Sequence, residues 1–331
     1  MRPVLASDVF GHERIRQLLQ RVLAGGRLPP AMLFVGPEGV GKRTLALAAG
    51  RTLVCEDVEG RRNGACGTCH ACRRSRRGLH PDLFEVKADG AVIKIDQVRT
   101  LVREINGRPF EASGRMFVVD DAHLMNEPAA NALLKALEEP PPTSHIVLVS
   151  ALPQGLLPTI RSRCQHVRFG GLPTSLVERH LLARGELDPG EARLRAVLAC
   201  GSFGAALAFE AESYRTRRDD LLELLETVDG ADALERMEAA ERLAEAEDTL
   251  SVLTTLRSLL RDVAALSLGA SIPALNVDVV PRLEALARGR LGARALRLAH
   301  EVGEARSALA ANANKLIALD LLLDSLSGRS G

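Results

Sequence analysis

The sequence predicts an α/β domain built on a parallel sheet, followed by two all-helical regions. Through about residue 168, short apolar runs typical of buried strands alternate with helical stripes. Two of these runs end in turns that carry chemistry, a glycine-rich turn after residue 35 and an acidic one after residue 119. Strand signals stop after Gly170-Gly171. Strands that alternate with helices favour a parallel sheet covered on both faces, with ligands at the carboxyl ends of the strands.

The elements expected in the first domain follow one another at short intervals. Strands are predicted at residues 31–35, 83–86, 116–119, 145–150 and 166–169. Helices are predicted at residues 13–23, 44–53 and 127–139, the last ended by Pro140-Pro141-Pro142. A further helix is expected from Asp96, which we interpret as its N-cap, to about residue 105.

The remainder of the chain reads as helical, because Ala, Leu, Glu and Arg dominate it. Two helices are expected within residues 174–200 around Asp188-Pro189-Gly190, and longer ones from about residue 219, including 250–266. The final helix is predicted to run from about residue 293 to 326. We therefore expect an α/β domain at residues 1–168, a small helical domain at 169–211 and a larger helical domain at 212–331.

Composition excludes several classes of protein. The 331 residues are 46% hydrophobic and 26% charged, with a net charge of +1, so no overall field draws the chain to nucleic acid or to a membrane. Trp is absent and there is one Tyr, which argues against a base-stacking platform. Because no segment resembles a signal peptide or approaches the roughly 18 apolar residues of a spanning helix, we expect a cytoplasmic protein without membrane contact.

Residues 36–44 read GPEGVGKRT, a phosphate-binding loop between a predicted strand and a predicted helix. Gly36, Gly39 and Gly41 allow backbone N–H groups to converge on phosphates, and Lys42 would reach the outer ones. The alternative is a glycine-rich turn that arose by chance, which the full spacing disfavours. The sequence therefore predicts a site for ATP or ADP.

Arg43 departs from this motif, because the position normally carries a Ser or Thr hydroxyl that holds Mg²⁺. Thr44 lies about 100° further around the helix, so it does not obviously take over that role. Residues 118–121, VVDD, complete the site with Asp120 to order the waters of a metal ion. Asp121 is one methylene shorter than the Glu that usually activates the attacking water, although both acids could simply cap a strand. These departures predict nucleotide binding without efficient turnover, or no binding.

Four of the six cysteines crowd together, at Cys55, Cys66, Cys69 and Cys72. Four thiolates at this spacing favour a tetrahedral zinc site, and with no open position the role would be structural. His70 is the one competing ligand nearby, and an iron–sulfur cluster or unligated cysteines are the alternatives. We expect the zinc module to span about residues 55–80.

Two arginine-containing segments complete the candidates. The run Arg73-Arg74-Ser75-Arg76-Arg77 could touch a phosphate backbone, or more simply form a solvated basic face. In Arg161-Ser162-Arg163-Cys164, an arginine at a domain edge could act in trans on the phosphates of a neighbouring subunit.

These segments together resemble a known family. Phe10-Gly11-His12, the phosphate loop, the cysteine insert, VVDDAHLM at 118–125, NALLKALEEPP at 131–141 and Ser162-Arg163-Cys164 are similar to the AAA+ clamp-loader subunits of bacterial DNA polymerase III. The resemblance covers residues 1 to about 210, and Asn312 to Leu316 fits the family less distinctively. It implies an AAA+ P-loop NTPase-like domain with a zinc-binding insert, then a helical lid domain and an all-α collar domain for oligomerisation.

Within the family the chain resembles the stator type, the delta-prime subunits, more than the gamma/tau motor ATPase. Arg43, Asp121 and Gly204 stand where the motor has a metal-binding hydroxyl, a catalytic Glu and a sensor arginine. Ser150 still matches a further sensor position. The resemblance implies that Arg163 completes the ATP site of a neighbour. It also implies gamma/tau and delta subunits as partners in a complex that loads the sliding clamp onto primed DNA.

Two alternatives remain open at the level of sequence. One is a gamma/tau-like motor that tolerates Arg43 and uses Asp120 and Asp121. The other is a nucleic-acid-binding module centred on the cysteine insert and the arginines at 73–77.

Overall fold

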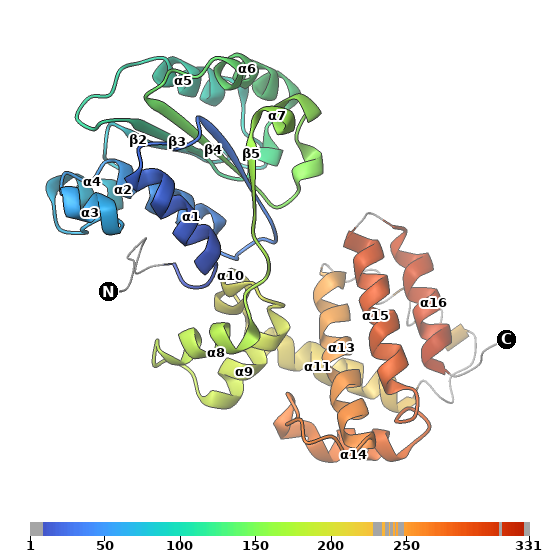
Figure 1. Cartoon of the computed structure of the whole chain (residues 1–331). Helices are drawn as coiled ribbons and strands as arrows, with labels where there is room; N and C mark the ends of the chain where they lie inside the picture. Colours follow the sequence, from blue (N-terminus) through green and yellow to red (C-terminus); the bar gives the residue numbers. More distant parts are fainter. Residues whose placement is uncertain are drawn as a thin grey trace. The chain divides into compact units, whose positions relative to one another are not determined.

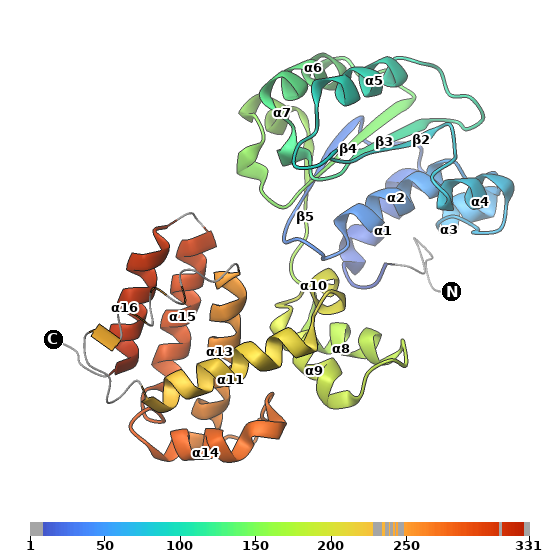
Figure 2. The same cartoon turned by 180° about the vertical axis from the view of Figure 1, so that it is seen from behind.

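Residues 9–227, 234–235, 238, 241, 243, 248–310 and 313–327 are described by the structure, a computed structural model. They belong to two compact units, Met1–Val177 with Cys200–Ala205, and Glu178–Ala199 with Ala206–Gly331. The α/β first unit and the helical second unit agree with the predicted fold class (Figures 1 and 2). The finer division at residues 168 and 211 stays a prediction.

A five-stranded parallel sheet forms the centre of the first unit, in the order β2-β3-β4-β1-β5. Its strands are β1 (Ala31–Val35), β2 (Leu83–Val86), β3 (Arg115–Val119), β4 (Ser144–Ser150) and β5 (Gln165–Arg168). All five were predicted within one residue at each end. Each residue of β1 and of β3 is buried, because helices cover both faces of the sheet.

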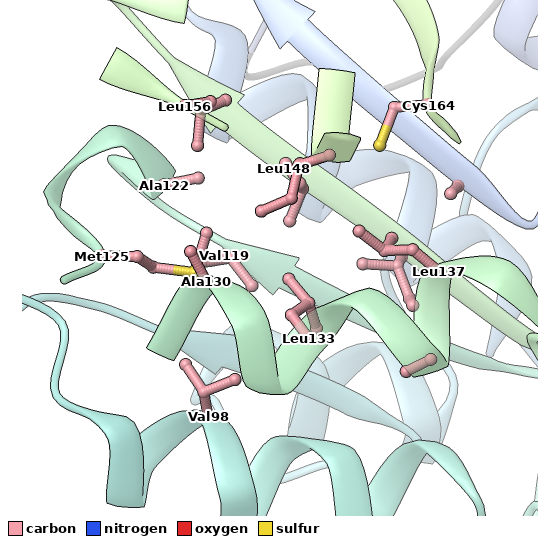
Figure 3. Packing of buried hydrophobic residues seen from close by; sticks show 14 of the residues in the cluster. Val98, Val119, Ala122, Met125, Ala130, Leu133, Leu137, Leu148, Leu156 and Cys164 are labelled. Carbon is pink, nitrogen blue, oxygen red and sulfur yellow. The ribbon is translucent and has the colours of Figure 1, made fainter. Parts of the chain in front are cut away.

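Alternate residues of the central strands enter two separate cores. Met32 and Phe34 of β1 pack with α1 (Glu13–Ala24) and α2 (Lys42–Leu53), whereas Leu33 faces the opposite side. That side is covered by α5 (Ile95–Ile105), α6 (Glu127–Glu138) and α7 (Pro158–Arg163), as Figures 1 and 3 show. The period-two alternation of a strand therefore places one apolar run in both cores.

Short helices and turns connect these elements. The cysteine insert contains α3 (Val58–Asn63) and α4 (His70–Arg76), on the same side of the sheet as α1 and α2 (Figures 1 and 2). Two strands are followed by 3₁₀ turns: η1 (Ala122–Leu124) comes after β3, and η2 (Pro153–Gly155) comes after β4. Helix α8 (Thr174–Leu182) begins in the first unit, and α10 (Phe203–Leu207) begins in its returning segment.

The predicted N-cap of α5 is wrong. The helix begins at Ile95 with Lys94 at the N-cap position, and Asp96 lies in the first turn. The Gln97 side chain accepts a hydrogen bond from the Lys94 backbone N–H at 2.9 Å, so a side chain from within the helix satisfies that donor.

The described part of the second unit contains helices and no strand. It contains α9 (Pro189–Leu198), α11 (Ala211–Thr227), α13 (Thr249–Ser267), η3 (Val277–Val279), α14 (Val280–Arg288), α15 (Ala295–Ala310) and α16 (Lys315–Ser327). Leucines from the five long helices α11, α13, α14, α15 and α16 form one core. No helix in the described ranges is long and apolar enough to cross a membrane.

The single final helix predicted from residue 293 to 326 is wrong, because residues 313–314 are not helical. The Asn314 side chain accepts a hydrogen bond from the Ile317 N–H at 3.2 Å and thereby starts α16 as a separate helix. Asn312, part of the segment that resembles the family, lies outside the described residues.

Leu133 tests the packing of α6 on the sheet, because its side chain is fully buried in the core of Figure 3. We expect Leu133→Ala to lower the free energy of unfolding by about 2–5 kcal/mol, since it leaves a cavity. Urea denaturation followed by circular dichroism measures this difference. Lys135→Ala, on the exposed face of the same helix, should change it by less than about 0.5 kcal/mol. Equal stability of the two variants would contradict the packing.

Candidate nucleotide and metal sites

The phosphate loop leaves the carboxyl end of β1 and enters α2 at Lys42. Gly36, Gly39 and Gly41 have φ values of 149°, 70° and 100°, a region that favours glycine. The Lys42 ammonium donates hydrogen bonds to the backbone carbonyls of Gly36 at 2.8 Å and Pro37 at 2.6 Å. Burial lowers the pKa of Lys42, against the attraction of nearby acids. The loop thus has the backbone form that the sequence predicts, with its lysine bonded to the loop itself.

Arg43 lies one residue further along α2, and its guanidinium contacts two acids. Its Nε atom hydrogen-bonds to the Glu85 carboxylate and lies 3.4 Å from Oδ2 of Asp120. The Lys87 ammonium lies 3.5 Å from the other Glu85 oxygen. The hydrogen bond with Glu85 raises the pKa of Arg43, so the guanidinium stays charged. The structure therefore brings Arg43 and Asp120 together and adds Glu85, which the sequence analysis missed.

The acids that follow β3 differ in their surroundings. Burial, and secondarily the charge of Asp121, raise the pKa of Asp120 in spite of Arg43. Asp121 has a left-handed backbone, with φ 45° and ψ 48°, at the start of η1. At the end of β4, the buried Ser150 hydroxyl lies 3.3 Å from Nδ1 of His123 and accepts a hydrogen bond from the Leu152 N–H. These side chains gather at one edge of the sheet, because they follow the carboxyl ends of parallel strands.

Gly204 packs directly against the phosphate loop. Its N–H donates to the Gly39 carbonyl at 3.0 Å, and a Cβ atom added to Gly204 would lie 2.9 Å from the Gly39 Cα. A Cβ at Gly39 would in turn lie 2.2 Å from the Ser202 hydroxyl. The absence of side chains at both glycines therefore permits this backbone contact. On the other side, Nε2 of His12 lies 3.0 Å from the Val40 carbonyl oxygen, so the Phe-Gly-His motif also touches the loop.

Arg163 lies at the opposite edge of the sheet from the phosphate loop, where the parallel strands begin. It ends α7, two residues before β5, whose first residue pairs with Met32 of β1. The phosphate loop follows the other end of β1, so the fold separates this arginine from the chain's own loop. The side chain is 35% exposed, and its guanidinium bonds to Glu138 at 2.6 Å and to the Thr159 carbonyl at 3.0 Å.

The four clustered cysteines come together as the sequence predicts. Cys55 follows α2, Cys66 precedes α4, Cys69 is the N-cap of α4 and Cys72 lies in its first turn. All four sulfur atoms lie within 4.8 Å of one another, with Cys55–Cys69 at 4.0 Å and Cys66–Cys72 at 3.9 Å. Tetrahedral Zn²⁺ with Zn–S bonds of about 2.3 Å requires sulfur separations of about 3.8 Å. The arrangement can hold a metal ion, and the exposed His70 is not part of it.

Backbone N–H groups point at the sulfur atoms of this cluster. Cys66 donates to Cys55 at 3.4 Å, Cys69 to Cys66 at 3.3 Å and Cys72 to Cys69 at 3.3 Å. Burial works against ionisation of Cys66, but the N–H groups of Cys69 and Thr68, together with the Thr68 hydroxyl, bring its pKa to about 6. Burial raises the pKa of Cys55 and Cys72. The N–H donors orient and stabilise thiolates, the form of cysteine that binds a metal.

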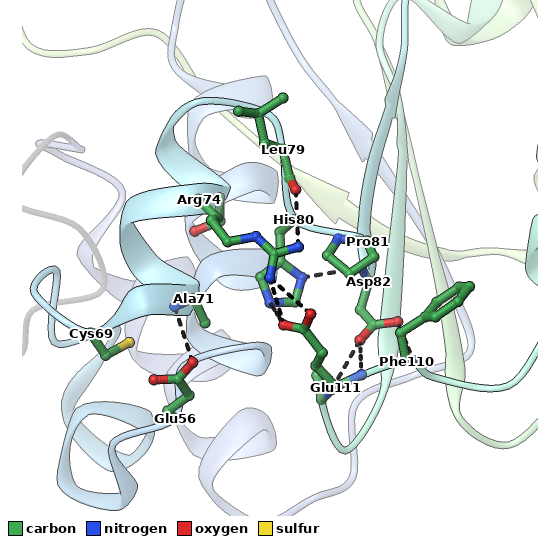
Figure 4. A network of polar contacts seen from close by, with 12 residues as sticks. Glu56, Cys69, Ala71, Arg74, Leu79, His80, Pro81, Asp82, Phe110 and Glu111 are labelled. Atoms are coloured by element: carbon green, nitrogen blue, oxygen red, sulfur yellow. Dashed lines mark hydrogen bonds and ion pairs between the residues drawn. The ribbon is translucent and has the colours of Figure 1, made fainter.

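A buried ionic network beside the insert was not foreseen from the sequence. Asp82, which has no exposed surface, accepts hydrogen bonds from the N–H groups of Phe110, Glu111 and Ala112 at 2.8–2.9 Å (Figure 4). The equally buried Arg115 lies 3.4 Å from Asp82. The network thereby holds the loop before β3 against the segment before β2.

This network also fastens the cysteine insert to the sheet. Arg74 of α4 donates to both carboxylate oxygens of Glu111, at 2.8 and 2.9 Å (Figure 4). The buried His80 accepts a hydrogen bond from the Asp82 N–H through Nδ1. One member of the arginine run is thus engaged within the fold. A charged residue at the start of an apolar strand, Arg115, is the sequence signal that could have revealed the network.

Asp82→Asn should lower the free energy of unfolding by about 1–3 kcal/mol near neutral pH, because the buried Arg115 would lose one of its two counter-ions and keep only Glu104, at 2.9 Å. Three N–H donors and Arg115 outweigh the opposing effect of burial and hold the pKa of Asp82 below its usual 3.8. The carboxylate therefore stabilises the fold above about pH 4, and this contribution is lost as the pH falls through the folded-state pKa.

Urea denaturation at neutral pH and below pH 4 measures this effect, and the difference between wild type and variant should shrink in acid. Asp89→Asn, at a carboxylate that is 73% exposed, is the control and should stay near wild type. A difference between wild type and the Asp82 variant that is independent of pH would contradict the role of the charge.

Comparison with known proteins identifies the family. A family model described as DNA polymerase III, delta subunit, matches residues 11–173. The DNA polymerase III subunit delta' of Bacillus subtilis (strain 168) is 38% identical over 185 residues, which are 55% of this chain and 54% of that protein. The subunit delta' of Pseudomonas aeruginosa is 36% identical over 227 residues, 67% of each chain.

More distant similarities extend to other subunits. The subunit tau of Escherichia coli (strain K12) is 32% identical over 212 residues, 62% of this chain and 32% of that protein. A gamma-subunit-related DNA polymerase III protein of Thermotoga maritima covers 95% of this chain and 98% of its own, with 21% identity and a TM-score of 0.38. The chain thus spans about half of the B. subtilis relative and two thirds of the P. aeruginosa relative. With 36% identity over two thirds of a delta' subunit, the chain belongs to the family of DNA polymerase III clamp-loader subunits and resembles its delta' members.

Proposed function

We propose that the chain is a delta'-type stator of the clamp loader, a subunit that completes the ATP site of a neighbour and turns over little or no ATP itself. The observation that carries the proposal is the separation of Arg163 from the chain's own phosphate loop. Because Arg163 precedes β5 while the loop follows β1, the guanidinium lies at the wrong edge of the sheet for its own site. Its partial exposure leaves it accessible to a second subunit.

The altered nucleotide site supports a stator rather than a motor. Arg43 contacts Asp120, Asp121 replaces the longer Glu, and Gly204 contacts the loop through its backbone. Each change removes a group that would stabilise charge during phosphoryl transfer, and such groups are typically worth several kcal/mol. ATP or ADP, held by the glycines, Lys42 and Thr44, would therefore be a ligand without efficient turnover.

Exposed apolar side chains on the last two helices support assembly with other subunits. Leu296 of α15 is 66% exposed, and Ile317 and Leu321 of α16 are 61% and 64% exposed. Ile317 and Leu321 lie four residues apart and so share one face of the helix. We propose that residues 212–331 form the collar, with gamma/tau and delta subunits as partners. In the cytoplasm, the assembly would load the sliding clamp onto primed DNA.

Substitution of Arg163 tests the stator role. In a complex reconstituted with gamma/tau and delta subunits, Arg163→Ala should lower turnover at the neighbouring ATP site by at least about 100-fold, since an arginine finger stabilises transition-state charge. ATP hydrolysis with clamp and primed DNA present is the measurement. Arg161→Ala, on the same helix, is the matched control. Unchanged turnover in an assembled Arg163→Ala complex would refute the proposed role.

The motor alternative is favoured by the similarity to the E. coli subunit tau. It requires Mg²⁺-dependent ATP hydrolysis by the isolated chain that disappears in Lys42→Ala. The stator predicts hydrolysis no higher than in that variant, so the isolated chain distinguishes the two functions.

We further propose that the cysteine cluster binds one structural Zn²⁺, which links α2 to α4. Elemental analysis should find about one zinc per chain, and Cys69→Ser should lose it. Chelation should lower the melting temperature of the wild type, because binding energy contributes to folding. Cys200→Ser, at an exposed cysteine outside the cluster, should retain the metal. Native protein without bound metal would contradict the site.

A further inference from the structure

The position at which ATP-hydrolysing phosphate loops hold a metal ion is filled by a side chain of this protein. In such loops, the hydroxyl after the lysine and the aspartate that ends the neighbouring strand hold Mg²⁺. Here the corresponding residues are Arg43 and Asp120, and the guanidinium Nε lies 3.4 Å from the Asp120 carboxylate. A guanidinium has five donors and no acceptor, so Arg43 is not a ligand for any metal ion.

The residues present therefore do not fit Mg²⁺. Arg43 removes one ligand, and its charge lies where the metal's charge would lie. The second acid in contact with it, Glu85, belongs to β2 and also contacts Lys87. Two carboxylates, Glu85 and Asp120, thus share the positive charge of Arg43, and Glu85 also faces Lys87.

The contact is more than a chance surface ion pair. Glu85 and Asp120 are only 24% and 19% exposed, and they reach Arg43 from two different strands. Asp120 is desolvated beside a second acid, an arrangement that is costly without a nearby cation. Arg43 supplies that cation permanently, because guanidinium does not lose its proton in proteins.

We infer that Arg43 is a built-in replacement for the divalent metal ion, so that this phosphate loop takes no Mg²⁺. The ligand class that suits such a loop is a metal-free nucleoside di- or triphosphate, bound through the glycine N–H groups and Lys42. The inference concerns this chain's own site and does not depend on Arg163 or on assembly with other subunits.

Fluorescently labelled ADP, titrated into the full-length chain with MgCl₂ and then with EDTA, tests the inference. In the wild type, ADP should bind in EDTA, and MgCl₂ should leave the affinity unchanged or weaken it, because Mg²⁺ in solution withdraws metal-free ADP; absence of binding in EDTA would contradict the proposed ligand class. Arg43→Thr restores a hydroxyl and frees Asp120, so Mg²⁺ should tighten ADP binding by about tenfold or more, corresponding to 1.4 kcal/mol. Arg43→Lys keeps a cation without a metal ligand, so Mg²⁺ should not tighten its binding of ADP.

Mn²⁺ provides a second measurement that does not rely on affinity for the nucleotide alone. Electron paramagnetic resonance of free Mn²⁺ with ADP should show metal bound by Arg43→Thr and not by the wild type, and circular dichroism establishes that each variant is folded. If Arg43→Thr does not fold, Arg43→Ser replaces it. Mg²⁺-dependent binding by the wild type would overturn the inference, as would a folded hydroxyl variant that is indifferent to both metals. Both results would leave the proposed role of Arg163 unaffected, because ATP hydrolysis by the reconstituted complex tests that role separately.

Discussion

Parallel pairing of the five strands is the constraint on which the first unit depends. It collects every carboxyl end at one edge of the sheet and every amino end at the other. The phosphate loop, Asp120 and Ser150 therefore share one edge, although they come from three strands. Asp82 and Arg163 precede their strands and Arg115 begins β3, so all three lie at the opposite edge. One topological fact thus separates the chain's own phosphate loop from the arginine that we assign to a neighbour.

At both edges of the sheet an arginine balances the charge of acidic side chains, but the two sites differ in burial. At the carboxyl edge, Arg43 balances Glu85 and Asp120 in partly exposed surroundings. At the amino edge, Arg115 and Asp82 are almost completely buried and are supplemented by three backbone donors. Burial of this ion pair costs desolvation free energy, which well-aligned contacts must offset. The pair therefore contributes more to holding the loop before β3 in one position than to the free energy of folding.

The cysteine insert is held in place by backbone hydrogen bonds and by an ion pair. Its four sulfur atoms are oriented by N–H groups of the same segment, and Arg74 ties the following helix to Glu111 of the anchored loop. The insert is thus connected to the sheet through α2 at Cys55 and through the ionic network at Arg74. A structural metal there would fix the first attachment while the network fixes the second.

The sequence by itself determined the elements and the classes of chemistry. Apolar runs locate β1, β3 and β4, since burial on both faces demands uninterrupted hydrophobicity, whereas the edge strands β2 and β5 are partly exposed and contain charged residues. Local spacing likewise identifies the phosphate loop and the four cysteines, because the residues of each motif lie within one short segment of the chain. The start of α5 and the break before α16 were misjudged, since side chains of Gln97 and Asn314 decided those helix ends.

Only the tertiary structure decided which distant residues meet. Arg43 and Glu85 are 42 residues apart, and Asp82 and Arg115 are 33 apart, so no local pattern relates them. Their contacts arise from the order in which the strands pair, which single-sequence periodicity does not encode. Tertiary packing of α10 likewise put Gly204 against the phosphate loop, and the parallel direction of β5 put Arg163 at the far edge, so local propensity sets neither position.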